Sequence, residues 1–302
     1  MQDKKSVLVF MATYNGEKYL ETQINSILQQ KDVDVYILVS DDKSSDSTSE
    51  ILERYAQKYD KFKYVINKEN KGFTYNFLDC IYSAKNEYDY YALADQDDYW
   101  EEDKLISAIN KIEKLGSDRG TLYCSNLTLA DENLKPFGMQ ENKKILKANK
   151  FNFIVGNIAT GCTIVFDAKL FSKILSYYPQ GIYLHDYWLF LIAVFTGDYI
   201  YDFDSHILYR QHGSNQIGSN KKIFTRKKIS QFFRNSYSQT IILKELLKGY
   251  RDMISEEDIK YLQIAANYKD NFATTLRLVF SRKIRRRLLN FLFKVKVLLR
   301  KF

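Results

Sequence analysis

The sequence Tyr-Tyr-Ala-Leu-Ala-Asp-Gln-Asp-Asp occupies residues 90–98 and joins an apolar run to a cluster of acidic and amide side chains. A short, continuous apolar run is typical of a strand that is covered on both faces of a sheet. Carboxylates directly after such a strand lie at the carboxyl edge of an α/β sheet, where they can hold a divalent cation against a diphosphate. The segment therefore predicts an α/β fold with a nucleotide-binding edge.

Strands and helices alternate through the first half of the chain. Each apolar run is followed by residues with helical spacing, and Asp46, Ser47 and Thr48 offer N-cap oxygens for the second helix. The predicted strands are 6–12, 35–39, 62–66, 88–94 and 121–129, and the predicted helices are 19–28, 51–59, 73–84 and 105–115. This alternation predicts a doubly wound, mostly parallel sheet flanked by helices.

The pattern becomes less regular after residue 130. Residues 131–149 are polar and contain Pro136 and Gly138, which indicates a surface excursion that covers a ligand. A strand is expected at 161–166, a buried helix at 187–195, and helices from residue 221 onward, where Ser255 and Asp258 form a capping box. We therefore expect an α/β domain at 1–220 and a helical C-terminal region at 221–302.

Composition indicates a globular protein with a sizeable core. The chain has 302 residues, of which 45% are apolar and 15% aromatic. Its three cysteines, at 80, 124 and 162, lie far apart, which argues against a zinc or redox pair and favours a reducing compartment. The apolar run at 7–12 is too short for a signal peptide, and the run at 187–195 is too short to cross a bilayer. These features predict a cytoplasmic protein.

The net charge of +8 comes from the end of the chain. Residues 276–302 carry ten Lys and Arg and no acidic residue, which leaves 35 basic and 37 acidic side chains elsewhere. Because the body is slightly acidic and no RNA-binding or helix-turn-helix signature occurs, nucleic acid is not an expected partner.

Three polar clusters follow buried strands that should end at one edge of the sheet. They are Thr13-Tyr14-Asn15, Asp41-Asp42-Lys43-Ser44 and Asp95-Gln96-Asp97-Asp98. Each alone has a structural explanation as a turn or a helix cap, but the three together favour a shared site.

A nucleotide-sugar would use these residue types. A cation held by Asp97, with Asp95 nearby, would neutralise the diphosphate, while Asp41 and the Thr13 main chain would accept hydrogen bonds from ribose and base. The chain contains no G-x-x-x-x-G-K-S/T or G-x-G-x-x-G loop, so phosphate binding through Mn²⁺ or Mg²⁺ is the simpler interpretation.

Together these segments resemble the inverting glycosyltransferase family 2. The resemblance rests on residues 12–20, 40–48, 70–72 and 94–100 and spans roughly residues 5 to 215. It implies a GT-A fold, in which Asp41 contacts the nucleoside and Asp95-Gln96-Asp97 is the D-x-D element. The later segments 185–188 and 209–213 are similar to those of bacterial rhamnosyltransferases that build cell-wall or capsular polysaccharide, which implies dTDP-L-rhamnose as donor.

The resemblance also assigns the general base. Asp186 matches the family's catalytic carboxylate and would accept the proton of the attacking hydroxyl. The rival candidate for the base is His185, since imidazole titrates near neutrality. The structural alternative for Asp186 is a role as N-cap of the helix that begins at Tyr187.

Further residues are expected around the two substrates. Those expected to contact the nucleotide are Thr13, Tyr14, Asn15, Glu17, Asp41, Asp42, Lys71, Asp95, Gln96 and Arg210. Those expected near the acceptor or the donor sugar are Asp98, Trp100, Gly161, Cys162, Thr163, His185 and Trp188.

The late loop that contains His212 is expected over the diphosphate. There His212 would be a metal ligand with Asp97, and Arg210 would pair with phosphate oxygens; the alternative for His212 is a solvent-facing loop residue. Cys162 is not expected to be a nucleophile, because inverting transfer forms no covalent intermediate.

The basic tail has an apolar stripe at helical spacing. Its members are Ile284, Leu288, Phe291, Val295, Leu298 and Phe302. A basic amphipathic helix suits an anionic membrane interface, and a lipid-linked glycan acceptor would place the protein at the inner face of the plasma membrane. The alternative is a terminal helix that packs on the core or on a second subunit of a homodimer.

Three functions compete. The leading hypothesis is a metal-dependent, inverting glycosyltransferase that moves L-rhamnose to a hydroxyl of a lipid-linked cell-wall or capsular precursor. The second is a non-catalytic, membrane-associated scaffold or nucleotide-sugar-binding protein of a glycan assembly complex. This hypothesis is disfavoured because the expected site is complete, with Asp41, Asp95, Asp97 and Asp186 all present. The third is a sugar nucleotidyltransferase, whose glycine-rich loop with an arginine after the first strand is absent.

Overall fold

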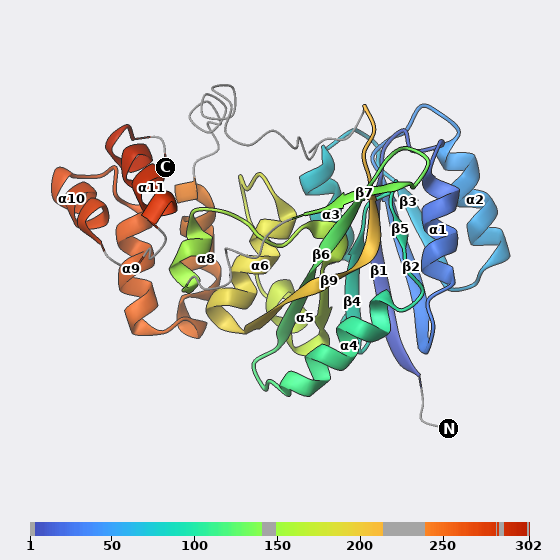
Figure 1. The fold of residues 1–302 in the computed structure, drawn as a ribbon, viewed down its shortest axis with the longest axis horizontal. Helices are drawn as coiled ribbons and strands as arrows, with labels where there is room; N and C mark the ends of the chain where they lie inside the picture. The colour runs from blue at the N-terminus through green and yellow to red at the C-terminus, as the bar shows by residue number, and fades with distance from the viewer. Residues whose placement is uncertain (1–3, 141–148, 214–238, 282, 284–286, 301) are drawn as a thin grey trace.

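A central sheet runs through the molecule, with helices on both of its faces and further helices at one end (Figure 1). The computed structural model describes residues 4–140, 149–213, 239–281, 283, 287–300 and 302. Within these residues the sheet has nine strands, in the order β3-β2-β1-β4-β8-β6-β9-β5, with β7 paired to β6. The mixed α/β architecture with a curled sheet agrees with the predicted GT-A class.

The first four strands are parallel, as the sequence predicts. They are β1 (Lys5–Thr13), β2 (Val33–Asp41), β3 (Phe62–Ile66) and β4 (Tyr90–Ala94). The helices that connect them are α1 (Leu20–Leu28), α2 (Thr48–Lys58) and α3 (Phe73–Ser83). Parallel strands end at one edge, so the loops after β1, β2 and β4 meet there.

The second half of the sheet is mixed. It contains β5 (Tyr99–Trp100), β6 (Thr121–Ala130), β7 (Pro136–Met139), β8 (Val165–Asp167) and β9 (Asp198–Arg210). Strand β8 is antiparallel to both β4 and β6, whereas β6 and β9 are parallel. The predicted surface excursion at 131–149 includes β7, and its residues 141–148 lie outside the described part of the chain.

The predicted strand at 161–166 is wrong at its start. Residues Gly161–Thr163 form a 3₁₀ turn, and the strand covers Val165–Asp167. Thr163 N donates to Thr160 O at 2.9 Å, and the Thr163 hydroxyl donates to the same oxygen at 2.8 Å. These local bonds take the place of the hydrogen bonds that a strand would form with a neighbour.

Two hydrophobic layers cover the sheet. In β1, Val7, Val9 and Met11 face one layer while Leu8 and Phe10 face the other, because successive side chains of a strand point to opposite sides. Helices α1, α2 and α4 (Lys104–Leu115) cover the first layer; α3, α5 (Ala168–Leu175) and α6 (His185–Thr196) cover the second.

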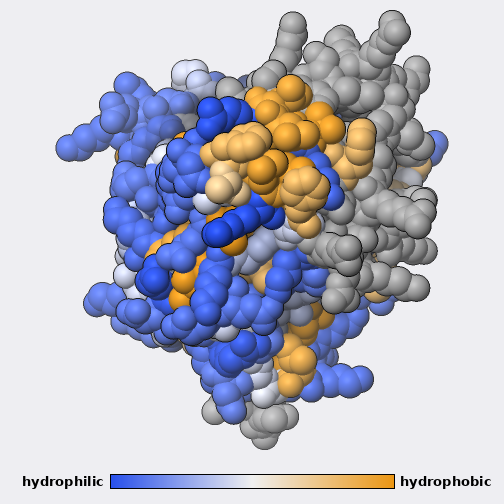
Figure 2. All heavy atoms as spheres, turned by 90° about the vertical axis from the view of Figure 1, so that its left-hand side faces the viewer, coloured by the Kyte–Doolittle hydropathy of each residue, from blue (hydrophilic) through white to orange (hydrophobic). Residues whose placement is uncertain are grey.

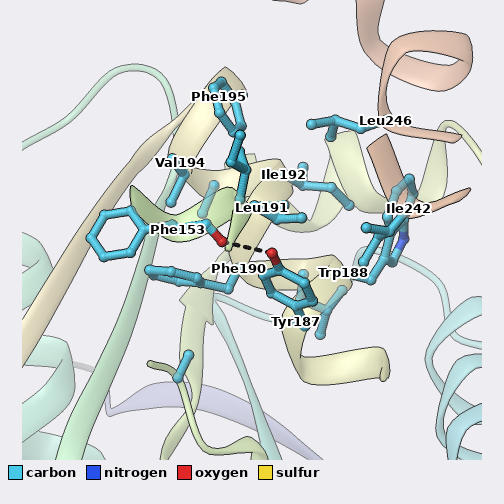
Figure 3. Close-up of a cluster of buried hydrophobic side chains, with 14 of the residues drawn as sticks. Phe153, Tyr187, Trp188, Phe190, Leu191, Ile192, Val194, Phe195, Ile242 and Leu246 are labelled. Atoms are coloured by element: carbon cyan, nitrogen blue, oxygen red, sulfur yellow. Dashed lines mark hydrogen bonds between the residues drawn. The ribbon is translucent and has the colours of Figure 1, made fainter. Parts of the chain in front are cut away.

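Helix α6 is apolar all round and is enclosed by protein (Figure 3). It extends the predicted helix at 187–195 by two residues at its start. Tyr187 Oη donates to the Phe153 carbonyl at 2.6 Å, which ties α6 to the 3₁₀ segment η1 (Lys150–Ile154). Trp188 packs on Tyr250 of α8 (Gln239–Tyr250) at 5.8 Å between ring centroids, and Ile242 and Leu246 of α8 belong to the same buried cluster (Figure 3). Because its surroundings are fixed, α6 presents its first turn to the carboxyl edge as a rigid support.

The C-terminal region is helical, as predicted. It comprises α8 (Gln239–Tyr250), the turn η3 (Arg251–Met253), α9 (Glu256–Ala266), α10 (Phe272–Phe280) and α11 (Arg287–Leu298). Ser255 caps α9, its hydroxyl accepting from Asp258 N at 3.3 Å. The proposed boundary near residue 220 lies outside the described residues. Among the described helices, none combines the length and apolar character needed to cross a bilayer.

The predicted apolar stripe of the tail does not form one buried face. Phe302 is buried against Tyr268, whereas Phe291 and Leu298 are exposed. Ile284 and the side chain of Leu288 lie outside the described residues. Lys296, expected on the charged side, is buried, and burial lowers its pKa.

Candidate active site

A cavity of about 970 Å³ opens at the carboxyl edge of the sheet. The loops after β1, β2 and β4, the segment before β8, the first turn of α6 and the end of β9 all contribute to its wall. The predicted site residues that line it are Thr13, Tyr14, Asn15, Asp42, Asp95, Gln96, Asp97, Gly161, His185, Asp186 and His212. The structure therefore brings together residues that are up to 199 positions apart, from Thr13 to His212.

The loops after β1 and β2 hold each other. Asn15 has a left-handed backbone (φ 48°), and its side-chain oxygen accepts from Ser45 N at 2.8 Å. The Glu17 carboxylate accepts from Ser47 N at 2.9 Å and does not line the cavity. Asn15 tolerates this backbone better than most residues because its short polar side chain bonds locally. These hydrogen bonds fix the loop after β1 to the loop after β2 at the edge of the cavity.

Of the two adjacent aspartates after β2, Asp42 lines the cavity and Asp41 does not. Asp41 is fully buried, where its carboxylate accepts from the Thr13 hydroxyl at 2.7 Å and from Ser44 N at 2.8 Å. Asp42 accepts from Gly72 N at 2.8 Å. Asp41 thus already has its hydrogen-bond partners within the protein, so the expected contact with a nucleoside would need these bonds to rearrange.

Gln96 joins the loop after β4 to the loop after β1. Its side-chain oxygen accepts from Tyr14 N at 2.8 Å, and its nitrogen donates to Tyr14 O at 3.1 Å. A Cβ at Gly16 would lie 2.5 Å from the Gln96 oxygen, so only glycine leaves room for this pairing. The acidic cluster is thereby fixed against β1.

His212 and Asp97 meet in the cavity, with His212 Nε2 2.8 Å from Asp97 Oδ2. The imidazole packs on Tyr19 at 4.8 Å between ring centroids. Arg210 packs on the same Tyr19 ring, and its Nε donates to the Asp97 carbonyl at 2.6 Å. Arg210 is buried and holds the loop that carries Asp97, and it does not line the cavity as phosphate pairing would require.

Two further carboxylates, those of Asp97 and Asp186, lie close enough to Asp95 to affect its pKa. Burial, followed by the negative charges of Asp97 and Asp186, raises the pKa of Asp95 to about 7. Mutual repulsion of this kind is relieved by a cation, and carboxylate oxygens with an imidazole are suitable ligands for Mn²⁺ or Mg²⁺. Asp97 and His212 are therefore suitable ligand types for a divalent cation, whereas the group around Asp95 whose ligand atoms lie within 4.8 Å of one another consists of Asp95, Asp98 and Cys162.

Asp186 lies in the first turn of α6 and lines the cavity. Its Oδ1 accepts from Tyr187 N at 2.6 Å, but the N-cap position of α6 is Leu184, so Asp186 is not the helix cap that the sequence allowed. Burial raises the pKa of Asp186 to about 7. A carboxylate with a pKa near neutrality is suited to accept a proton at physiological pH.

His185 is the weaker candidate for a base. It is buried and stacks on Phe77 at 4.0 Å between ring centroids. Burial lowers the pKa of His185 to about 3, so the ring is neutral and holds a proton poorly. Neither ring nitrogen has a hydrogen-bond partner among the described residues, although the residue lines the cavity.

Several predicted site residues do not reach the cavity. Asp98 is buried beneath it, where its carboxylate accepts from Arg210 N at 3.0 Å. Lys71 pairs with Asp79 at 2.6 Å. Four more residues that were expected near the acceptor or the donor sugar are fully buried and do not line the cavity: Trp100, Cys162, Thr163 and Trp188. Burial raises the pKa of the Cys162 thiol well above its usual value, which agrees with an inert cysteine.

Other cavity residues were not identified from the sequence as site residues. They include Tyr19, Asn76, Phe77, Asn157 and Tyr209. Asn76 and Phe77 belong to α3 and have the spacing of ordinary helix residues, so no local signal marks them. Tyr19 and Tyr209 lie within segments that carry the resemblance, 12–20 and 209–213, and that was the available signal for these two residues.

The model of Glycosyl transferase family 2 matches residues 8–175. The chain is also 32% identical over 246 residues to a dTDP-rhamnosyl transferase, RfbG, of Shigella flexneri, covering 78% of this chain and 82% of the relative.

Solved structures share the fold at low identity. The S. aureus protein TarS (residues 1–349), in complex with UDP-GlcNAc, has a TM-score of 0.60 at 18% identity and covers 92% of this chain and 74% of TarS. The mannosyltransferase PcManGT of Pyrobaculum calidifontis, in complex with GDP-Man and Mn²⁺, has a TM-score of 0.51 at 15% identity. This match covers 100% of this chain and 89% of PcManGT.

Proposed function

Because the chain belongs to glycosyltransferase family 2, we propose that it transfers L-rhamnose from dTDP-L-rhamnose, with inversion, to a hydroxyl of a lipid-linked bacterial glycan precursor. The chain is a glycosyltransferase, and the similarity to a dTDP-rhamnosyl transferase supports the donor. We further propose that residues 1–220 form the catalytic domain and that residues 221–302 form a helical appendage.

The observation that carries this proposal is the meeting of Asp186 with the Asp95–Asp97 loop in one cavity. The loop offers carboxylates to the diphosphate end of a donor, and Asp186 comes from a different element, the rigid start of α6. A sugar bound between them would have its leaving group on one side and a base on the other, as a single displacement requires.

In the reaction, Asp186 accepts the proton of the acceptor hydroxyl while that oxygen forms a bond to the anomeric carbon. The bond between that carbon and the diphosphate oxygen breaks, and its electron pair leaves with the nucleoside diphosphate. Since a single displacement attacks from the face opposite the leaving group, the anomeric configuration is inverted. The pKa of about 7 lets Asp186 be ionised before the reaction and accept a proton during it.

Asp97 and His212, with Asp95 nearby, are the residues that would hold a divalent cation. Such a cation would supply Lewis-acid stabilisation of the departing diphosphate. Arg210 supports the arrangement through the Asp97 carbonyl, and Gln96 fixes the same loop to Tyr14. Neutral His185, whose two ring nitrogens have no hydrogen-bond partner within the described part of the chain, is suited to bind a sugar hydroxyl.

A lipid-linked acceptor and a position at the inner face of the plasma membrane are part of the proposal. The tail, with ten cations and no acidic residue, supports a site of action at an anionic surface. A cell-wall or capsular precursor that is built on a lipid carrier would be presented there.

A donor screen tests the function. Purified protein is incubated with sugar nucleotides and Mn²⁺ or Mg²⁺, and release of the nucleoside diphosphate is measured with and without a polyprenyl-linked glycan acceptor. We expect dTDP-L-rhamnose to support release and the Asp186→Asn variant to bind it without turnover. Release from another sugar nucleotide only would reject the donor, and donor binding without release from any of them would favour the scaffold alternative.

A further inference from the structure

The outer face of α10 and α11 carries the most exposed large apolar side chains among the described residues. Phe272 and Phe280 are each 73% exposed, Phe291 is 64% exposed and Leu298 is 58% exposed. Figure 2 looks onto the end of the molecule that these helices form, and hydrophobic side chains gather in the upper part of that face. A gathered apolar patch on a folded protein marks an interaction surface.

Helix α11 has two apolar faces. Phe293 and Val297 point inward and are buried, and Phe293 packs on Phe302 at 4.7 Å between ring centroids. Phe291 and Leu298, separated by seven residues, lie on the opposite side and are exposed. The inner face is sufficient to hold α11 on the protein, so the outer face is not needed for the fold.

Helix α10 continues this surface. Phe272, Leu276 and Phe280 recur every four residues on its outer side, while Leu278 faces inward and is fully buried. Helices α10 and α11 pack against each other. We define the docking face as the outward residues of these two helices: Phe272, Leu276, Arg277, Phe280, Phe291, Lys294, Val295 and Leu298.

The charges on the docking face are of one sign. Arg277 is exposed, Lys294 is partly exposed, and no ion pair is formed by either within the described residues. The sequence from 271 to 302 contains no Asp or Glu. Cations interspersed among aromatic and aliphatic side chains are the composition of a helix that lies in a membrane interface.

From these observations we propose that the docking face binds the surface of an anionic lipid bilayer. The phenylalanines and Leu298 would enter the boundary between headgroups and acyl chains, while Arg277 and Lys294 would contact anionic headgroups. A second copy of the chain fits the face less well, because a two-fold contact would bring together two faces that both carry cations and no acidic residue.

The position of the docking face suits an enzyme whose acceptor is held in the membrane. Figure 1 places α10 and α11 at one end and towards the top, the side to which the carboxyl ends of β1 and its parallel neighbours point. The catalytic cavity lies at those strand ends. The proposal does not depend on the donor sugar or on Asp186, so its failure would reject the membrane position and leave the proposed sugar transfer standing.

Flotation of the full chain with lipid vesicles tests the proposal. Vesicles of phosphatidylcholine are compared with vesicles of equimolar phosphatidylcholine and phosphatidylglycerol, and the second should bind the protein far better. Because each surface cation contributes about 1 kcal/mol, Arg277→Gln with Lys294→Gln should weaken that binding roughly 30-fold. Phe272→Ser with Phe280→Ser should weaken it about tenfold or more.

Two controls make the result interpretable. Phe137→Ser with Phe203→Ser changes two phenylalanines outside the docking face, on the strands β7 and β9, that are 45% and 46% exposed, and this variant should float like the parent. Release of the nucleoside diphosphate with a water-soluble acceptor should be the same in all variants. The proposal is overturned if the protein binds both vesicle types equally. It is also overturned if neither the Arg277→Gln/Lys294→Gln pair nor the Phe272→Ser/Phe280→Ser pair changes the binding. A dimer in solution that the Phe272→Ser/Phe280→Ser pair dissociates overturns it as well.

Discussion

Replacing Asp186 by asparagine removes the proposed base while keeping the shape of the side chain. Its Oδ1 accepts from Tyr187 N, and an asparagine oxygen can keep that bond. General base catalysis contributes about 10²- to 10⁴-fold, so we expect kcat to fall by that factor, or about 3–5 kcal/mol in the activation barrier. Donor binding should change little, because the Asp95–Asp97 loop is intact.

The pH dependence gives a second magnitude. With a pKa of about 7, roughly one tenth of Asp186 is ionised at pH 6 and about nine tenths at pH 8. The parent's kcat/KM should therefore rise about tenfold between these values, and the variant's should not. The groups that face Asp186 are Asp95, Tyr183 and His185, and the last two have pKa values of about 12 and about 3, outside this range. The pKa of Asp95 is also about 7, so Asp95 could produce the same rise of kcat/KM with pH. The rise is assigned to Asp186 only if it disappears in the Asp186→Asn variant.

Stability provides the control for this variant. The folded-state pKa of Asp186 is raised from 3.8 to about 7, so its contribution to stability is lost as pH rises through that interval. An uncharged asparagine avoids the free-energy cost of burying an ionised carboxylate. At pH 8 the variant should therefore melt at the same temperature as the parent or at a higher one. Initial rates of nucleoside diphosphate release and thermal melting are the assays. Near-normal kcat in a folded variant would refute the assignment of the base.

The remaining predictions concern the cation, one glycine and the thiols. Asp97→Asn should weaken donor binding in the presence of Mn²⁺ by about tenfold or more in calorimetry, and unchanged affinity would contradict its role. Gly16→Ala should cost about 1–3 kcal/mol in urea unfolding, because the methyl would displace the Gln96 amide and break its two hydrogen bonds to Tyr14, whereas Gly156→Ala, with open space, should cost nothing comparable. The three buried cysteines should resist iodoacetamide until the protein unfolds, and rapid labelling of Cys162 in the native state would argue against the packing described.

Sequence reasoning worked best where local pattern and burial agree. The parallel strands β1 to β4 and their helices follow from continuous apolar runs and helical spacing, and the meeting of their end loops follows from topology. It failed at Gly161–Thr163, the start of the predicted strand at 161–166, which forms a 3₁₀ turn because its hydrogen bonds close locally. Apolar character predicts burial there, but it does not decide between a strand and a turn.

The sequence by itself determined the α/β class, the acidic edge and the basic tail, since each depends on residues that are close together in the chain. Only the tertiary structure decided which polar groups face the cavity. Asp41 and Asp42 are neighbours, yet one is buried in hydrogen bonds and the other lines the wall. Likewise, only the packing of α11 showed that Phe293 and Val297 hold the helix and leave Phe291 and Leu298 exposed. Orientation and burial depend on contacts between distant segments, and a linear pattern does not contain them.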